Sequence, residues 1–329
     1  MRVHRQDSRA AAGFKCSGRI HVYLSGKHII TMDFLGRIDL QGQPLDLDIT
    51  LACGQAFRWR KLDNGAWRGV VRDRLVEVKC ADGVLLWRTF PAADEAVVID
   101  YFRLTQDINS VCSELSARDP HLAELTSRYA GLRLVRQDPV ETLMSFVCSA
   151  ANSIPKISAA IEGLCAQYGD LVCEHQDLCY YAFPSISAIA EAESADLENT
   201  EALAFRGANL KMVARQVMER GENWLHGLRE VSYAEAKAQL TSIRGVGSKI
   251  ADCVCLFSLD MDEAVPVDTH VRQLAKRLFL PDMKAKSITD AVYRRIQETF
   301  WQRYGDLAGW AQQFLFYEDL LRSRQRRKR

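Results

Sequence analysis

The sequence lacks the features of a helical membrane protein, a structural zinc protein and a cluster-binding protein. It has no run of about eighteen apolar residues, which excludes a transmembrane helix. Its ten cysteines are scattered, and no pair has the Cys-x-x-Cys spacing of a zinc site. No cysteine follows Cys255, which excludes a C-terminal iron–sulfur cluster. Without a disulfide framework either, we expect an intracellular protein with no metal and no other cofactor.

A net charge of one sign is also absent. The chain has 43 basic and 42 acidic residues, a formal net charge of +1, and this balance does not indicate nucleic acid binding. Arginine and lysine are nevertheless concentrated in the last eight residues. A basic tail, 324–329, can add salt-dependent affinity for a polyanion.

The first 31 residues contain six Lys or Arg and a single acid, Asp7. A transit peptide is rich in arginine and poor in acids, so this interpretation is open. The alternative is a disordered or untranslated extension ahead of Met32. We favour the extension because the segment shows no clear period.

The rest of the chain predicts an α+β fold. Apolar and polar residues alternate from Gln55 to Phe90 in four runs, with hairpin signals at Asp63-Asn64-Gly65 and Asp82-Gly83. From about Ala92 onward the whole pattern is helical. We therefore expect a small antiparallel sheet domain with flanking helices at 32–130 and a helical domain at 131–323.

One helix of the second domain has the composition of a core helix. Asp138 provides a cap, and Pro139 and Glu141 stand at favourable positions of the first turn. The apolar run after them ends before Ile154-Pro155, where the residue preceding a proline leaves the helical region.

The stretch from Leu240 to Val271 predicts two helices joined by a glycine hairpin and followed by a third. Ser232 and Glu235 form a capping box ahead of the first helix. In the hairpin, Gly245 and Gly247 permit positive φ and a close approach of the backbone. The second helix starts at once, with Ser248 as its expected cap, so its positive end faces the same way. These features predict a phosphate-binding device.

Lys249 stands in the first turn of this second helix. The positive helix end disfavours its charged form, and partial burial would lower its pKa further. A neutral lysine amine is a nucleophile that forms Schiff bases. Cys253 lies one turn later on the same face, and Asp268 is expected to cap the third helix across the loop. The pattern predicts an amine and a carboxylate at one site.

Each feature alone has an ordinary explanation. A Gly-Val-Gly turn is usually only a turn, a lysine in a first turn is usually solvated, and an aspartate before a helix is usually only a cap. Gly54, before the second strand, is likewise most simply a turn glycine. The conjunction of hairpin, Lys249 and Asp268 is what favours a catalytic site.

Several runs together resemble the 8-oxoguanine DNA glycosylases of the helix-hairpin-helix superfamily, over about residues 39–323. The matching runs are GQAFRWR, VRQDPVETLMSFVCSAANSI, GVGSKIADCVCL, AVPVDTHV and GWAQQFLF.

The resemblance implies a bifunctional base-excision-repair glycosylase and lyase, acting as a monomer on double-stranded DNA that carries 8-oxoguanine, with no membrane partner. Lys249 would attack the sugar C1′, and Asp268 would stabilise the positive sugar and help to activate the lysine. The damaged nucleotide would be flipped out of the duplex into a pocket.

The resemblance also assigns binding residues. Phe316 and Cys253 would sandwich the base, Gln312 would read its Watson–Crick edge, the Gly54 carbonyl would accept from N7–H, and Pro266 would line the pocket. Phe205 would wedge into the vacated space, and Arg206 would contact the opposite cytosine. The remaining residues expected at the DNA are Asn152, Lys156, Gly245, Gly247 and His270. Alone, Phe316 would be core, Gln312 surface and His270 a satisfied histidine.

The chain departs from the family pattern at two positions that face the opposite base. Ala151 stands where the family often has asparagine, and Lys156 stands where it often has arginine. Lysine cannot replace the bidentate fork of arginine. We therefore expect a relaxed choice of the base opposite the lesion. Arg244 in place of a common proline, and Phe205 in place of a common tyrosine, should not abolish function.

Two alternative functions remain at this point. One is a glycosylase for alkylated bases without strand cleavage, which would share the aspartate but has no need of Lys249. The other is a non-catalytic helix-hairpin-helix DNA-binding module, which would have no reason to place Gln312, Phe316 and Cys253 around a lysine.

Overall fold

The structure, a computed structural model, describes residues 21–22, 30–31, 34–149, 152–200, 203, 206–221 and 223–327. Within the extension predicted at 1–31 it describes only β1 (His21–Val22), which pairs antiparallel with β2 (Ile30–Thr31). The remainder of that prediction lies outside the described residues, as does the end of the basic tail.

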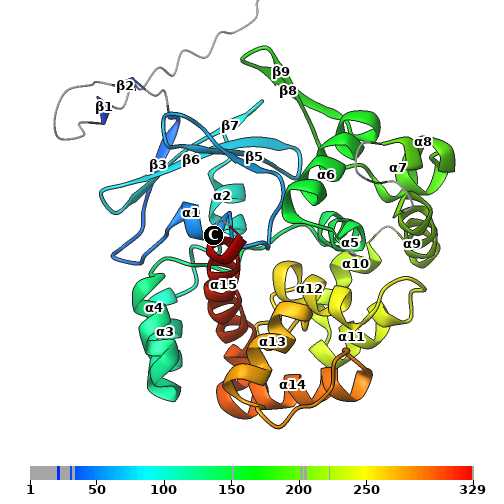
Figure 1. The fold of residues 1–329 in the computed structure, drawn as a ribbon. Coiled ribbons are helices and arrows are strands. Elements are labelled where there is room, and N and C mark those ends of the chain that lie inside the picture. Colours follow the sequence, from blue (N-terminus) through cyan, green and yellow to red (C-terminus); the bar gives the residue numbers. More distant parts are fainter. Residues whose placement is uncertain are drawn as a thin grey trace, which may run out of the picture.

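The predicted antiparallel sheet is present, and it has five strands in the order β3-β7-β6-β5-β4 (Figure 1). Asp82 and Gly83 both have positive φ (49° and 75°), as their tight β6–β7 turn requires. The four predicted runs correspond to β4–β7. The edge strand β3 was not predicted, because four residues offer too little alternation. The strands are β3 (Gly36–Asp39), β4 (Trp59–Lys61), β5 (Trp67–Val71), β6 (Arg74–Ala81) and β7 (Val84–Phe90).

Helices form most of the remaining chain and surround the long helix α15, which runs through the middle of the view in Figure 1. Aspartate side chains cap α1 to α5 at their N-termini, as the sequence predicts for α5. The helices are α1 (Leu47–Thr50), α2 (Glu95–Tyr101), α3 (Ile108–Arg118), α4 (Pro120–Arg128), α5 (Pro139–Cys148), α6 (Ile154–Tyr168), α7 (Ile186–Glu191), α8 (Ser194–Asn199), α9 (Arg206–Arg220), α10 (Trp224–Gly227), α11 (Tyr233–Thr241), α12 (Ser248–Ser258), α13 (Thr269–Leu278), α14 (Asp290–Tyr304) and α15 (Ala308–Arg327), with short 3-10 turns at Leu228–Glu230 and Gly305–Leu307.

The prediction that everything after Ala92 is helical is wrong at one place. Strands β8 (Leu171–His175) and β9 (Leu178–Tyr181) form a hairpin between α6 and α7. This hairpin is tied to the N-terminal sheet by Arg68, whose guanidinium donates to Tyr180 Oη at 2.9 Å and to Gln176 Oε1 at 2.7 Å. Its support therefore comes from a strand more than a hundred residues earlier, which local pattern cannot reveal.

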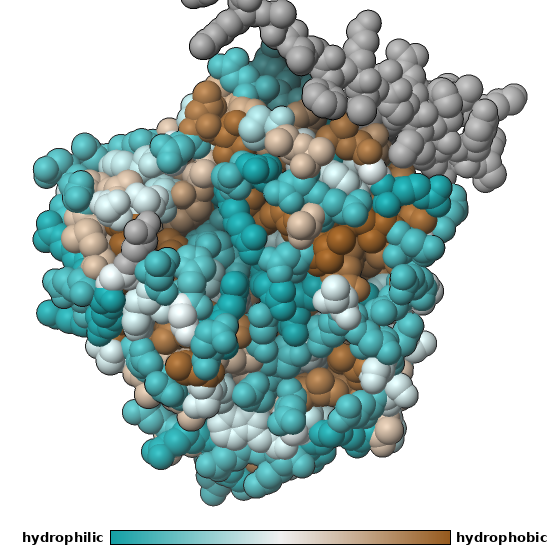
Figure 2. Space-filling model, turned by 180° about the vertical axis from the view of Figure 1, so that it is seen from behind, coloured by the Kyte–Doolittle hydropathy of each residue, from teal (hydrophilic) through white to brown (hydrophobic). Residues whose placement is uncertain are grey.

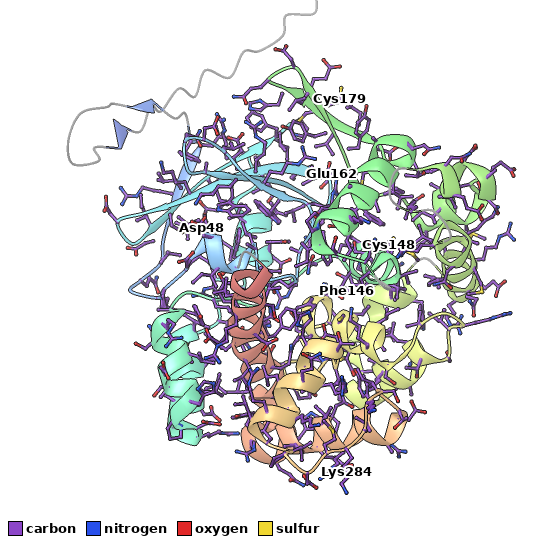
Figure 3. The ribbon with its side chains drawn as sticks, in the orientation of Figure 1. Asp48, Phe146, Cys148, Glu162, Cys179 and Lys284 are labelled. Atoms are coloured by element: carbon purple, nitrogen blue, oxygen red, sulfur yellow. The ribbon has the colours of Figure 1, made fainter. Side chains whose placement is uncertain are left out.

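Two hydrophobic cores lie side by side. One is built on the sheet with α1 and α2, and the other combines α3 and α4 with the later helices. The predicted core helix α5 has every residue from Glu141 to Cys148 buried. It packs on α12, with the rings of Phe146 and Phe257 stacked at 5.7 Å between centroids. Phe146 thus lies near the centre of the molecule (Figure 3).

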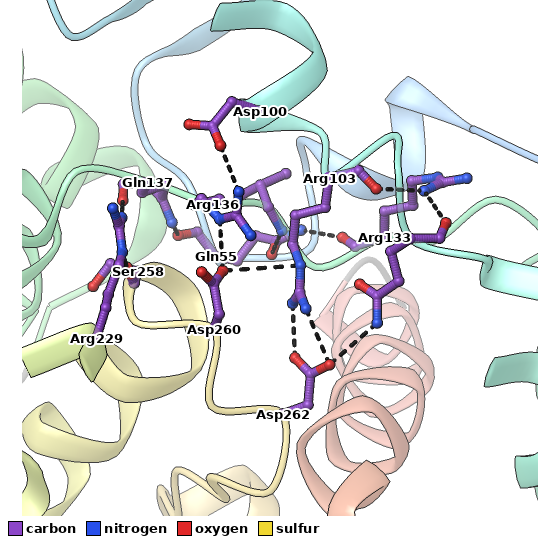
Figure 4. Close-up of polar contacts among 12 residues, drawn as sticks. Gln55, Asp100, Arg103, Arg133, Arg136, Gln137, Arg229, Ser258, Asp260 and Asp262 are labelled. Carbon is purple, nitrogen blue, oxygen red and sulfur yellow. Dashed lines mark hydrogen bonds and ion pairs between the residues drawn. The ribbon is translucent and has the colours of Figure 1, made fainter. Parts of the chain in front are cut away.

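Charged pairs fix the loop after α12 to the chain that precedes α5 (Figure 4). Arg103 Nη1 lies 2.7 Å from Asp262 Oδ1. Arg136 contacts Asp260 through Nε at 2.8 Å and Asp100 through Nη1 at 2.5 Å. These pairs therefore hold the loop that leads from α12 to Asp268.

No helix in the described ranges is long and apolar enough to cross a bilayer. The face opposite to that of Figure 1 is covered mainly by hydrophilic residues, interrupted by separate hydrophobic patches (Figure 2).

Candidate active site

The glycine hairpin between α11 and α12 is anchored at its base. Ser232 accepts a hydrogen bond from Glu235 N at 3.3 Å, which confirms the predicted cap of α11. Gln216 of α9 makes two hydrogen bonds to the residue before the hairpin. Its Oε1 accepts from Arg244 N at 2.9 Å, and its Nε2 donates to Arg244 O at 3.1 Å. Gly245 has φ +94°, and a Cβ there would lie 2.5 Å from Asn209 Oδ1, so only glycine fits.

The expected cap of α12 is wrong by one residue. Gly247 occupies the cap position with φ −86°, and Ser248 is already the first helical residue. The cap therefore has no side chain to occupy the first amides of α12. Gly247 is exposed, and a Cβ added to it would meet no described atom within 4 Å. The amino end of α12 is thus open to an anion approaching from outside.

Lys249 is half-buried in the first turn of α12 and points back to the end of α5. Its Nζ donates to Ser149 Oγ at 3.1 Å and lies 4.6 Å from the centre of the Phe146 ring. The ring face attracts the ammonium, and the hydroxyl replaces water as its acceptor. The amine thus donates to Ser149 rather than to Asp268.

Asp268 caps α13, as predicted, by accepting from Val271 N at 2.8 Å, and it remains half-buried. Cys253 lies within the electrostatic reach of both charged residues. Burial raises the pKa of its thiol to about 12, the Lys249 ammonium opposes this rise, and the Asp252 and Asp268 carboxylates add to it. Cys253 is therefore a protonated thiol that is only 2% exposed and lies one helical turn from Lys249.

The Gly54 loop lies against Phe316 of α15 and Ile154 of α6. Gly54 has φ +86°, and a Cβ there would lie 3.5 Å from Phe316 and 3.4 Å from Ile154. Its neighbours are fixed from both sides. Gln313 Nε2 donates to Cys53 O at 3.3 Å, and the buried Gln55 donates to Arg133 O at 2.7 Å. The positive φ and these anchors hold the Gly54 peptide in a set orientation beside Phe316.

Gln312 lies one turn before Phe316 on α15 and is only 4% exposed. Its Oε1 is buried and has no hydrogen-bond partner within the described part of the chain. Buried side-chain oxygens are nearly always paired, and an unpaired one costs about 1–3 kcal/mol. A donor on a ligand that reached this oxygen would recover that cost.

Pro266 and His270 lie two residues before and two residues after Asp268. The imidazole packs edge-on against Phe316, with 6.0 Å between ring centres, and its Nδ1 lies 3.3 Å from Asp319 Oδ2. Pro266 is buried in the turn that leads to Asp268. The contact of His270 with Phe316 therefore connects the Asp268 turn to α15, which also carries Gln312.

The residues predicted to contact the DNA around the vacated space and the opposite base have a different setting. Asn152 is half-buried and uses its amide to donate to Cys148 O at 3.4 Å, closing the end of α5. Lys156 is exposed in the first turn of α6, and Arg206 is the half-buried first residue of α9. Phe205 and Ala151 lie outside the described residues.

Three residues were missing from the sequence-based prediction: Ser149 and Phe146, which contact the amine, and Gln313, which anchors the Gly54 loop. Ser149 follows the core helix α5, and that position was the single available signal for it. Within the described part of the chain, no group of three His, Cys, Asp or Glu residues could hold a metal ion.

Comparisons with known proteins agree with this geometry. Residues 37–143 match the family model "8-oxoguanine DNA glycosylase, N-terminal domain", and residues 144–304 match "HhH-GPD superfamily base excision DNA repair protein". The N-glycosylase/DNA lyase OGG1 of Arabidopsis thaliana is 32% identical over 288 residues, which is 84% of this chain and 78% of the relative.

Two solved structures of the Clostridium acetobutylicum 8-oxoguanine glycosylase/lyase are similar as well. The apo form is 33% identical with a TM-score of 0.74, over 83% of this chain and 92% of that one. The complex with double-stranded DNA containing cytosine opposite 8-oxoguanine is 32% identical with a TM-score of 0.75, over 85% and 93%. The chain belongs to the 8-oxoguanine DNA glycosylase family of the helix-hairpin-helix base excision repair superfamily.

Proposed function

We propose that this protein excises 8-oxoguanine from duplex DNA as a bifunctional N-glycosylase and DNA lyase, with Lys249 as the nucleophile and Asp268 as its electrostatic partner. The observation that carries the proposal is the Lys249 amine, which contacts Ser149 Oγ and the Phe146 ring one helical turn before the buried Cys253, whose thiol is within electrostatic reach of both Lys249 and Asp268. The names of the relatives supply the substrate, because the Clostridium protein was solved on a duplex containing 8-oxoguanine.

In the first step Lys249 Nζ, after losing a proton, attacks C1′ of the flipped nucleotide. The glycosidic bond breaks, its electron pair leaves with the base, and the base takes up a proton. Positive charge develops on the sugar as the bond lengthens. The half-buried Asp268 carboxylate, fixed by its cap bond to Val271, stabilises that charge without having to reorganise.

In the second step the sugar ring opens, and Lys249 holds C1′ as a protonated Schiff base. This positive nitrogen accepts electron density when a proton leaves C2′, so the bond from C3′ to its phosphate oxygen breaks by β-elimination. Hydrolysis then releases the amine. Ser149 and Phe146 stabilise the ammonium between turnovers, since they contact it in the absence of substrate.

Recognition of the base follows from the donors and acceptors of the pocket. Gln312 Oε1 accepts from the N–H groups on the Watson–Crick edge of a purine that also bears an oxo group. Phe316 and Cys253 cover the two faces of the ring. The Gly54 carbonyl accepts from N7–H, which 8-oxoguanine has and guanine lacks. Guanine would leave that carbonyl unpaired, a cost of about 1–3 kcal/mol.

Borohydride trapping tests the function on a duplex carrying one 8-oxoguanine. We expect a covalent protein–DNA adduct with the wild type and none with Lys249→Gln. Base release without an adduct would instead indicate a monofunctional glycosylase. Binding with neither product would indicate a DNA-binding module.

A further inference from the structure

A buried polar cluster surrounds the residue of α12 that precedes Cys253. Its centre is Asp252, a carboxylate with no exposed surface one residue before Cys253. Tyr233 Oη donates to Asp252 Oδ1 at 2.7 Å, and Tyr293 Oη donates to Oδ2 at 2.6 Å. Oδ2 also accepts from Lys237 Nζ at 3.0 Å and from Gln297 Nε2 at 2.9 Å. We refer to these five residues as the Asp252 cluster.

Two members of the Asp252 cluster also hold the turn that leads to Asp268. Tyr293 Oη accepts from Val267 N at 3.1 Å, and Gln297 Nε2 donates to Val265 O at 3.0 Å. Val265 and Val267 are each at most 1% exposed, so neither backbone group has water as an alternative. Both groups flank Pro266, and Val267 is covalently joined to Asp268.

The other two members do not touch this turn. Tyr233 and Lys237, both on α11, have hydrogen bonds to Asp252, to Gln297 and to each other. The cluster therefore contains two tyrosines that make the same bond to the same carboxylate. One of them continues to the Asp268 turn and the other does not.

The hydroxyl of Tyr293 thus connects the two helices of the reaction. It donates a hydrogen bond to Asp252 on α12, the helix of Lys249, and accepts one from the N–H of Val267, two residues before α13 begins. Acceleration by a fixed carboxylate depends on its position, and a displacement of about 1 Å can cost about a hundredfold in rate. The Tyr293 hydroxyl is hydrogen-bonded to both segments.

We propose that Tyr293 is a positioning residue that sets the Asp268 carboxylate relative to the Lys249 amine, through its paired hydrogen bonds to Val267 and Asp252. This inference rests on the roles of Lys249 and Asp268 proposed above.

The test compares Tyr293→Phe with Tyr233→Phe in the full chain, on a duplex with cytosine opposite 8-oxoguanine. Both variants keep the ring and remove one donor from Asp252, so we expect both to lower the melting temperature. Only Tyr293→Phe leaves Val267 N–H without an acceptor. We expect it to slow single-turnover base release about 10- to 100-fold with duplex affinity changed less than about twofold. Tyr233→Phe should slow it less than about threefold.

A double-mutant cycle separates positioning from general destabilisation. In an Asp268→Asn background, Tyr293→Phe should slow the residual reaction by less than about twofold, because the carboxylate it positions is gone. A full, multiplicative loss in that background would overturn the proposal, as would equal slowing by the two tyrosine variants.

A second variant guards against misfolding of Tyr293→Phe. Gln297→Leu removes the bond to Val265 O and should also slow base release without weakening duplex binding, and rates equal to wild type in both variants would refute the proposal. Failure of the proposed function would be seen separately, as full activity of Lys249→Gln or Asp268→Asn themselves.

Discussion

The pocket around Lys249 and the edge that is expected to face the opposite strand are built in contrasting ways. In the pocket, Cys253 and Gln312 are 2% and 4% exposed, and their helices pack into the larger hydrophobic core. At the edge, the Lys156 side chain is exposed, and the Asn152 side-chain amide donates a hydrogen bond to a backbone carbonyl of α5. The chemistry therefore sits in a rigid, pre-formed site, whereas opposite-base recognition depends on side chains that water also solvates.

This difference has an energetic consequence. A buried group such as Gln312 Oε1 gains strongly from the correct partner, because the alternative is an unpaired acceptor. An exposed lysine gains little from one base over another, because water competes and its charge is not directional. Lesion recognition should thus be sharp, and opposite-base recognition broad.

The largest effect is expected for Lys249→Gln. Removal of the nucleophile should eliminate the Schiff base and lower base release by at least about a thousandfold, since no other group forms the covalent intermediate. Gel detection of the adduct and single-turnover rates measure this. Lys284→Gln is the matched control, because Lys284 is exposed and lies far from Phe146 (Figure 3); activity lost equally in both would argue against a role for Lys249.

Asp268→Asn should come next. Asparagine keeps the helix cap but removes the charge, so turnover should fall about 100- to 1,000-fold while duplex affinity changes less than about threefold. Equal losses of rate and affinity, measured by single turnover and fluorescence anisotropy, would mean that the aspartate acts only as a cap.

Gln312→Leu tests recognition of the damaged base. Loss of the acceptor should reduce the specificity constant on 8-oxoguanine about 10- to 100-fold, corresponding to roughly 1–3 kcal/mol. The exposed Gln302 gives the control, Gln302→Leu, which should leave this constant unchanged. If Gln312→Leu also left the specificity constant unchanged, the unpaired oxygen would have no part in base recognition.

Lys156→Arg tests recognition of the base opposite the lesion. The wild type should prefer cytosine over the other opposite bases by less than about a hundredfold, and the arginine variant should raise that preference several-fold, because a bidentate contact discriminates by about 1–3 kcal/mol. Excision rates on four duplexes that differ in the opposite base measure this. A wild-type preference above about a hundredfold would contradict the prediction.

Local features of the sequence were sufficient for the elements with strong signals. Asp138 before Pro139, Ser232 with Glu235, and Asp268 before α13 all cap helices as expected. The β8–β9 hairpin was missed because its stability comes from Arg68 on a distant strand. The cap of α12 was misplaced because Ser248 is the stronger capping residue, yet the hairpin geometry selects Gly247.

Tertiary contacts of the site were beyond the sequence. The contact of Lys249 with Ser149 joins residues a hundred positions apart. The bond between Tyr293 and Val267 joins α14 to the turn that precedes α13. Neither spacing follows a helical or strand period. Motifs can identify the reacting groups, whereas the residues that orient them are fixed by packing.

Peptide mapping of the trapped adduct tests most directly that Lys249 is the amine that bonds to the sugar. After borohydride reduction on an 8-oxoguanine duplex and tryptic digestion, mass spectrometry should find the modified lysine in the peptide that begins at Gly245, with Lys249 carrying the nucleotide and resisting cleavage. An adduct on Lys237, Lys156 or any other amine, with Lys249 unmodified, would contradict this assignment.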